Sequence, residues 1–198
     1  MLDQSIIVFT HRPSEFLIKL NGSTSWKLNP IRARDCEYVI CTRNRHSALR
    51  DDNISHRSAF LVGKISNITQ SLNLPRDEKR YMIEFQEYAE INIPDIWGGW
   101  RGPVKYILTR ELDIDFGNLH WKTTPDRDID YVNQYFSMEN AHYEREEKLY
   151  SETKEKKLEK YRQEFLRPKD GISIDEAKKG LSEFYGISEE NIEIILKG

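Results

Sequence analysis

Hydrophobic and aromatic residues in the first two thirds of the chain are gathered into short runs of strand length. These runs are rich in β-branched and aromatic residues, which favour strands, and a glycine inside LVGKIS indicates a bulge or a close backbone approach. SEFLIKLNG, from Ser14, predicts a short helix between the first two runs. Closely spaced short strands with a helix or two between them favour a small mixed β-barrel over a parallel α/β sheet. The clearest runs are SIIVFT (5–10), EYVICT (37–42), AFLVGKISNI (59–68) and RYMIEFQEYAEINI (80–93).

The pattern changes over residues 137–167, where charged residues of both signs dominate. AHYEREEKLYSETKEKKLEKYRQEFL contains no glycine or proline, and Glu144 precedes Lys148 with the i,i+4 spacing that supports a helix. Apolar positions such as Leu149 and Leu158 are sparse. We expect one long, exposed helix with a thin apolar stripe, which ends at Arg167-Pro168.

A third pattern begins near residue 170. Ser173 and Glu176 have the spacing of a capping box, which predicts the start of a helix. An amphipathic helical pattern follows, and Gly186 is the expected C-terminal stop of this helix. NIEIILK (191–197) alternates like a strand. A segment of about 29 residues is too short to hold a core alone. The predicted fold is therefore α+β: a small mixed β-barrel over 1–136, a long charged helix over 137–168 and a helix-strand module over 169–198.

Charge is distributed unevenly along the chain. The formal net charge of −3 excludes a uniformly basic nucleic-acid binder. Residues 11–64, however, hold ten Lys and Arg against five Asp and Glu, and Arg and Asn suit bidentate contacts with phosphates and base edges. The alternative is a solvated loop with ion pairs to neighbouring aspartates. The basic and polar residues that we consider candidates for nucleic-acid binding are His11, Arg12, Arg43, Asn44, Arg45 and His46.

The segment DIWGGWRGPVKY (95–106) combines tryptophans, glycines and an arginine. Glycines allow close approach of the backbone, and Trp97 and Trp100 could then offer flat faces to a base beside Arg101. Stacking of a base on an aromatic ring contributes roughly 1–3 kcal/mol. Trp26 is a third candidate wall of such a pocket. The alternative is that both loop tryptophans close the end of the barrel as core residues.

The order of these features resembles the PUA-like superfamily, which includes EVE, ASCH and YTH domains. The likeness covers about residues 5–110 and is carried by IIVFT, a Trp-containing segment, YVICTRNR, AFLVGKISNI and RYMIEFQEYAEI. It implies a non-catalytic reader of DNA or RNA that holds a modified or flipped base in an aromatic pocket. An ASCH-like amidohydrolase acting on modified nucleosides is an alternative, with Lys64 and Glu84 as candidate catalytic groups.

Other chemistry is poorly represented. Cys36, Cys41, His46 and His56 do not have a convincing zinc-site pattern, and no phosphate loop or nucleophile elbow occurs, so we expect no metal and no cofactor. Two cysteines and the absence of a signal peptide or long apolar run favour the cytoplasm and no membrane contact. A second hypothesis is an adaptor without its own ligand, in which residues 138–198 bind a protein partner or a second copy.

Overall fold

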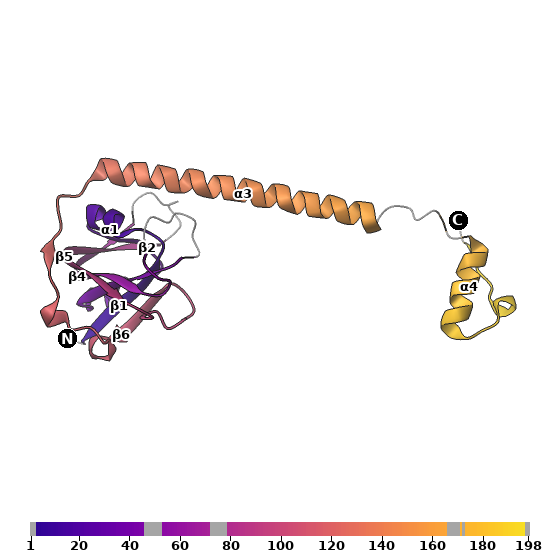
Figure 1. The fold of residues 1–198 in the computed structure, drawn as a ribbon, viewed down its shortest axis with the longest axis horizontal. Helices are drawn as coiled ribbons and strands as arrows, with labels where there is room; N and C mark the ends of the chain where they lie inside the picture. Colours follow the sequence, from indigo (N-terminus) through magenta and orange to yellow (C-terminus); the bar gives the residue numbers. More distant parts are fainter. Residues whose placement is uncertain (1–2, 46–52, 72–78, 166–170, 172, 197–198) are drawn as a thin grey trace. The chain divides into compact units, whose positions relative to one another are not determined.

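A computed structural model describes residues 3–45, 53–71, 79–165, 171 and 173–196. The protein is a mixed α+β chain with a seven-stranded sheet curled into a half-barrel and one long helix (Figure 1). Three 3₁₀ turns complete the described elements, at Thr109–Glu111, Phe116–Asn118 and Glu189–Asn191. The strands and helices are β1 (Gln4–Thr10), α1 (Ser14–Leu20), β2 (Gly22–Trp26), α2 (Pro30–Arg34), β3 (Tyr38–Arg43), β4 (Ala59–Gln70), β5 (Tyr81–Ile93), β6 (Val104–Leu108), β7 (Lys122–Thr123), α3 (Ile129–Phe165) and α4 (Ile174–Tyr185).

The sheet has the strand order β2-β5-β4-β3-β1-β6, and β7 also pairs with β5. β1 and β3 run parallel, with Ile7 opposite Ile40, and the other neighbours are antiparallel. A parallel pair needs a crossover connection, and here it passes through α1, β2 and α2. The curl of the sheet brings β2 to the end of β1, although three strands separate them in the strand order.

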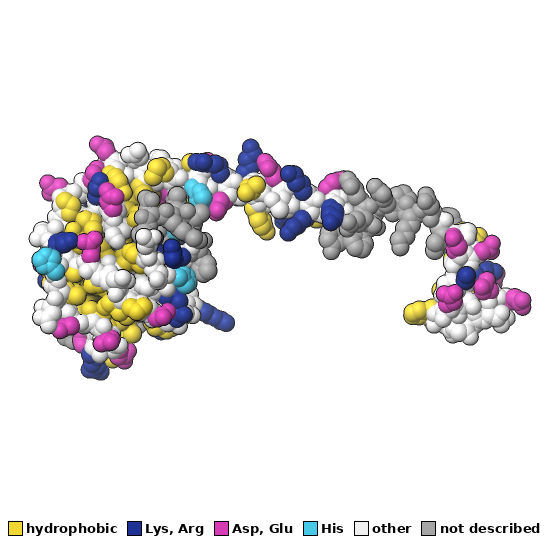
Figure 2. Space-filling model, in the orientation of Figure 1, with side chains coloured by type: hydrophobic (Ala, Val, Ile, Leu, Met, Phe, Trp, Pro, Cys, Tyr) yellow, Lys and Arg dark blue, Asp and Glu magenta, His cyan; other side chains and the backbone are white. Residues whose placement is uncertain are grey.

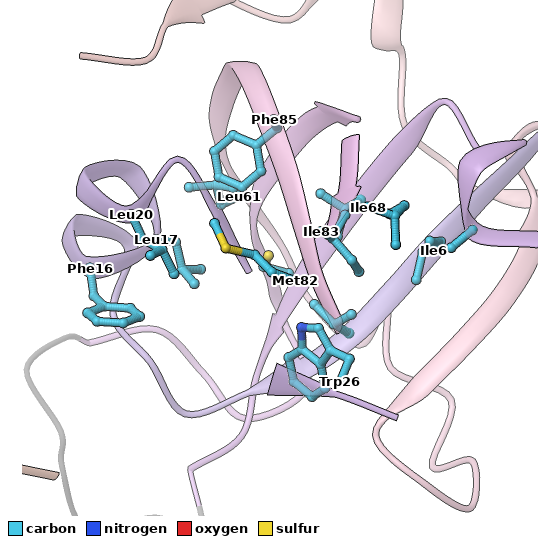
Figure 3. Close-up of a cluster of buried hydrophobic side chains, with 14 of the residues drawn as sticks. Ile6, Phe16, Leu17, Leu20, Trp26, Leu61, Ile68, Met82, Ile83 and Phe85 are labelled. Atoms are coloured by element: carbon cyan, nitrogen blue, oxygen red, sulfur yellow. The ribbon is translucent and has the colours of Figure 1, made fainter. Parts of the chain in front are cut away.

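The larger hydrophobic cluster lies between α1 and one face of the sheet (Figure 3). Phe16, Leu17 and Leu20 of α1 are buried there, and each fully buried side chain of this kind contributes roughly 1.5–3 kcal/mol. A Cβ atom on Gly63 would lie only 2.5 Å from Cγ of Phe85. The glycine in LVGKIS is thus explained by a close approach, one of the two explanations that its position in the strand predicted.

A second hydrophobic cluster covers the opposite face of the sheet. Because side chains alternate along a strand, Ile6 of β1 joins the first cluster while Ile7 joins the second. Trp97 and Ile40 are buried with Ile7. Both faces of β1 are therefore covered, which explains why SIIVFT is almost continuously apolar.

Several predicted elements are confirmed and others are not. The four strand runs and the helix at Ser14 are present, with Asn21 as the left-handed C-cap of that helix. The long helix begins at Ile129, earlier than expected. The predicted strand at 191–197 is wrong over the described part, because residues 192–196 form no strand. The sequence reading missed β2, α2 and β6.

The chain divides into two compact units, residues 1–141 and 142–198. Within the second unit, α4 begins with the expected capping box, in which Ser173 Oγ accepts from the Glu176 amide. Gly186 has a positive φ of 64° and ends the helix. None of the residues of α4 is buried. Across the described part of the chain, no helix is both long and apolar enough to cross a membrane.

Candidate functional site

A cavity of about 330 Å³ lies at the C-terminal end of β1. Ligand pockets in proteins have volumes of roughly 300–1,000 Å³, so this cavity falls at the small end of that range. Its walls come from three places: the end of β1 with the turn that follows it, the end of β2, and the residue before β5. The lining residues are Phe9, Thr10, His11, Arg12, Thr24, Ser25, Trp26 and Arg80.

Arg12 is the most firmly held cation of the cavity. Its Nη2 lies 2.9 Å from Oε2 of Glu139, its Nε donates to the other carboxylate oxygen at 3.3 Å, and its Nη1 donates to the carbonyl of Thr24. The guanidinium also lies over the rings of Phe16 and Phe136, at 5.3 and 5.1 Å from their centroids. These contacts fix a positive group at the cavity wall before any ligand binds.

Glu139 holds this cluster together from α3. Its side chain is only 5% exposed and lies 2.6 Å from Nε2 of His11. Burial would raise the pKa of Glu139, but hydrogen bonds from His11 and Arg12 and the charge of Arg12 outweigh it, and the pKa is lowered to about 2. Glu139 is therefore ionised at neutral pH, and it accepts a hydrogen bond from protonated Nε2 of His11.

Two aromatic residues form the apolar wall of the cavity. The ring of Phe9 stacks on Trp97 with a centroid distance of 4.8 Å and an interplanar angle of 7°. Trp26 donates its indole N–H to Ser23 Oγ at 3.0 Å, and is 7% exposed. Its body belongs to the core cluster (Figure 3), so only a small part of the indole faces the cavity. This wall therefore presents to the cavity only the edges and parts of the faces of the two aromatic rings.

Polar groups complete the lining. Arg80 donates from Nη1 to the carbonyl of Ser25 at 3.3 Å, which places a second guanidinium beside the cavity. The Oγ of Ser25 is buried and has no hydrogen-bond partner among the described residues. Buried hydroxyls are normally satisfied, so this oxygen lacks an expected partner, and a ligand can reach it only after the side chain rotates towards the cavity. Thr24 Oγ1 instead pairs with Ser71 Oγ at 2.9 Å.

Arg43 has a different role from the one the sequence suggested. It is 4% exposed, and its Nη1 donates to the carbonyls of His11 and Arg12 at 2.9 and 2.8 Å. Its guanidinium lies 4.1 Å from the ring centroid of Phe60. In this structure Arg43 positions the segment that lines the cavity, and its contact with base edges stays a prediction.

The neighbours of Arg43 also support the end of β1. The backbone amide of Asn44 donates to the carbonyl of Thr10 at 2.8 Å, and that of Arg45 donates to Nδ1 of His56 at 3.2 Å. Both residues are half-buried, and neither lines the cavity. His46 lies outside the described residues.

The tryptophan loop does not form the expected stacking platform. Trp97 is 3% exposed. Phe9 stacks on its ring, and Trp100 makes an edge contact with it, with a centroid distance of 5.1 Å and an interplanar angle of 82°. The expectation of a free indole face is therefore wrong for Trp97. Trp100 is half-buried, with the ammonium of Lys105 5.6 Å from its ring centroid, and Arg101 is exposed.

The glycines of this loop explain its sequence. A Cβ atom on Gly98 would lie 2.8 Å from the Trp100 ring, and Gly99 and Gly102 have φ angles of 72° and 78°. The loop therefore needs glycine to seat both indoles against the sheet. The core interpretation of the loop, which was one of the two open alternatives, accounts for Trp97.

The candidate catalytic pair of the amidohydrolase hypothesis is engaged elsewhere. Lys64 Nζ lies 2.8 Å from Glu87 and 4.5 Å from the centroid of the Trp121 ring. Glu84 lies 3.3 Å from Arg127 and accepts from Thr69 Oγ1 at 3.0 Å. Neither residue lines the cavity. Within the described residues, no group of three His, Cys, Asp or Glu could hold a metal ion.

The structure brings together three of the predicted residues, His11, Arg12 and Trp26, and adds others that the sequence reading missed. The signal for Glu139 was present: it follows Val132 by seven residues on an otherwise apolar helix face, which indicates a buried acid. The remaining missed residues are Phe9, Thr10, Thr24, Ser25 and Arg80. A comparison of the chain with protein-family models, curated proteins and solved structures finds no match in any of the three, so the geometry of this cavity is the basis for assigning a function.

Proposed function

We propose that the first unit binds one nucleotide of a DNA or RNA strand in the cavity at the end of β1. The observation that carries this proposal is the pairing of an aromatic wall with two guanidinium groups around about 330 Å³. A nucleotide presents a flat ring and a phosphate, which match these two kinds of surface. The likeness to PUA-like readers of modified or flipped bases is part of the same proposal.

The roles of the lining residues follow from their contacts. Arg12 is paired with ionised Glu139, so it fixes the shape of the cavity wall and contributes little net positive charge. Arg80, half-buried at the cavity wall, contacts the phosphate. Ser25 Oγ, which is buried and has no partner in the described structure, hydrogen-bonds the edge of the base once its side chain rotates into the cavity. Trp26 and Phe9 contact the ring.

The test is a fluorescence-polarisation assay with labelled oligonucleotides. Single-stranded DNA, single-stranded RNA and duplex DNA, each unmodified and methylated, are titrated with the full chain at 50 and 200 mM salt. Affinity falls with added salt, because a phosphate contact releases counterions. Ser25→Ala weakens binding about two- to tenfold, the effect of one hydrogen bond, while leaving stability unchanged because the hydroxyl has no protein partner.

The matched variants are Arg80→Gln and Arg110→Gln. Arg110 is exposed and lies at the opposite end of β1, where Thr109 bonds to Asp3. Arg80→Gln weakens binding about tenfold, equivalent to one lost charged contact, and Arg110→Gln leaves it unchanged. No binding at 50 mM salt, or an equal loss in both arginine variants, contradicts the proposal.

A further inference from the structure

The face of α3 that covers the sheet continues along the helix as an exposed stripe. Val132, Tyr135 and Glu139 are buried within the first unit. Phe136 also packs there, and residues seven positions apart on a helix lie on the same face after two turns. Tyr143 and Tyr150 follow Phe136 at this spacing, yet they are 44% and 72% exposed.

The stripe extends further along α3. Leu158 is 52% exposed. Figure 2 shows hydrophobic side chains interrupting the charged surface of this helix. Tyrosine and leucine at this spacing form an apolar seam suited to a second helix.

Charge along the same segment is divided into two halves. Residues 142–152 contain four Glu against one Arg and one Lys, a net −2, whereas residues 154–160 contain four Lys against two Glu, a net +2. A parallel pair of such helices would set like charges side by side. An antiparallel pair sets the acidic half of each helix against the basic half of the other.

The spacing of the stripe has the same symmetry. Tyr150 and Leu158 are each four residues from Lys154, and in the sequence Tyr143 and Phe165 are each eleven residues from it. An antiparallel pair centred on Lys154 therefore opposes apolar positions to apolar positions.

We propose that residues 142–165 pair with the same segment of a second copy, antiparallel and symmetric about Lys154. Tyr150 of each chain then packs on Leu158 of the other, and Glu146 and Glu147 lie near Lys160 of the other chain. The two Lys154 stems lie along the seam with their ammonium groups in solvent. None of the residues of this surface lines the cavity, so the proposal does not rest on nucleotide binding.

The first test measures the mass of the full chain by sedimentation equilibrium from 1 to 100 µM. The expected result is a dimer of about twice the chain mass of 23.5 kDa at the upper concentrations. Reversing the acidic half with Glu144→Lys, Glu146→Lys and Glu147→Lys weakens the dimer at least about tenfold, because both ends of the pair then repel. Lys154→Leu strengthens it.

A charge-exchange control tests the orientation. A chain that carries the acidic-half reversal together with Lys154→Glu, Lys156→Glu and Lys157→Glu regains the dimer in an antiparallel pair, since the halves have exchanged sign. Disulfide capture gives a second readout: Lys154→Cys cross-links to its copy at the symmetry axis, whereas Glu147→Cys does not. The native Cys36 and Cys41 are buried, so the parent chain is the blank.

Three outcomes overturn the proposal. The first is a monomer at every concentration up to 100 µM. The second is equal cross-linking of the Lys154→Cys and Glu147→Cys variants, which indicates a parallel pair. The third is a dimer that resists the charge reversal but disappears when residues 171–198 are deleted, which places the contact on the α4 module.

Discussion

Replacing Glu139 with glutamine tests the central arrangement of the cavity. Glu139→Gln keeps the shape of the side chain but leaves Arg12, whose side chain is 11% exposed, without its counter-ion. Breaking a buried ion pair in this way costs about 3–5 kcal/mol. A pKa of about 2 in the folded protein against an ordinary 4.5 corresponds to about 3 kcal/mol of stability, in agreement with the first figure.

The pH dependence of that stability has a definite sign. Because the pKa of Glu139 is lower in the folded protein, its contribution is fully present above pH 4.5 and is lost as the pH falls towards 2. Urea unfolding, followed by tryptophan fluorescence and by circular dichroism, gives the free energy of unfolding of both proteins at each pH. The difference between wild type and Glu139→Gln is about 3 kcal/mol at pH 7 and shrinks between pH 4.5 and 2.

The matched control is Glu155→Gln, on the same helix. Its side chain is exposed and lies off the apolar stripe, so the expected change is below about 0.5 kcal/mol. A loss of less than about 1 kcal/mol in Glu139→Gln at pH 7 would refute the reasoning. Two stability curves that stay parallel between pH 4.5 and 2 would do the same.

Three further predictions concern the two faces of the sheet. Gly63→Ala places a Cβ 2.5 Å from Cγ of Phe85, so we expect a loss of about 1–3 kcal/mol in thermal unfolding; unchanged stability would show that the strands can separate without cost. Burial raises the pKa of Cys36 to about 11 and that of Cys41 to about 12, so both thiols react slowly with a disulfide reagent at pH 8 until urea unfolds the chain, and rapid reaction of the native protein would contradict this. Trp97→Ala removes a ring that is 3% exposed and costs about 3–5 kcal/mol; a folded variant of normal stability would return Trp97 to the candidates for ligand stacking.

The pattern of apolar residues predicted the strands correctly where one face or both faces of the strand are buried. SIIVFT and AFLVGKISNI form β1 and β4 because their side chains fill both faces of the sheet. β2 was missed because GSTSW is polar in sequence, although most of it is buried. The strand predicted near Ile192 was wrong over the described residues 192–196. Alternation of apolar and polar residues does not by itself form a strand, because a strand needs a neighbouring strand to pair with.

The candidate site was only partly predictable, for a physical reason. His11 and Arg12 follow a strand end in a basic stretch, and this local feature is visible in the sequence. The arrangement of Glu139 beside them depends on a contact across more than 120 positions. Trp97 illustrates the opposite error: a tryptophan beside glycines suggested an exposed surface, but the glycines serve to bury the ring.

The carboxylate that Arg12 needs comes from the third turn of α3, and this decides where the first unit can be cut. A shortened protein ending at residue 136 would keep every strand of the half-barrel. It would nevertheless leave the buried guanidinium of Arg12 without a counter-ion in low-dielectric surroundings. The compact unit that contains this ion pair extends to Ala141, so we expect a stable shortened protein to end there or later. The helix is thus, for its first three turns, a part of the barrel's own charge balance rather than an appended arm.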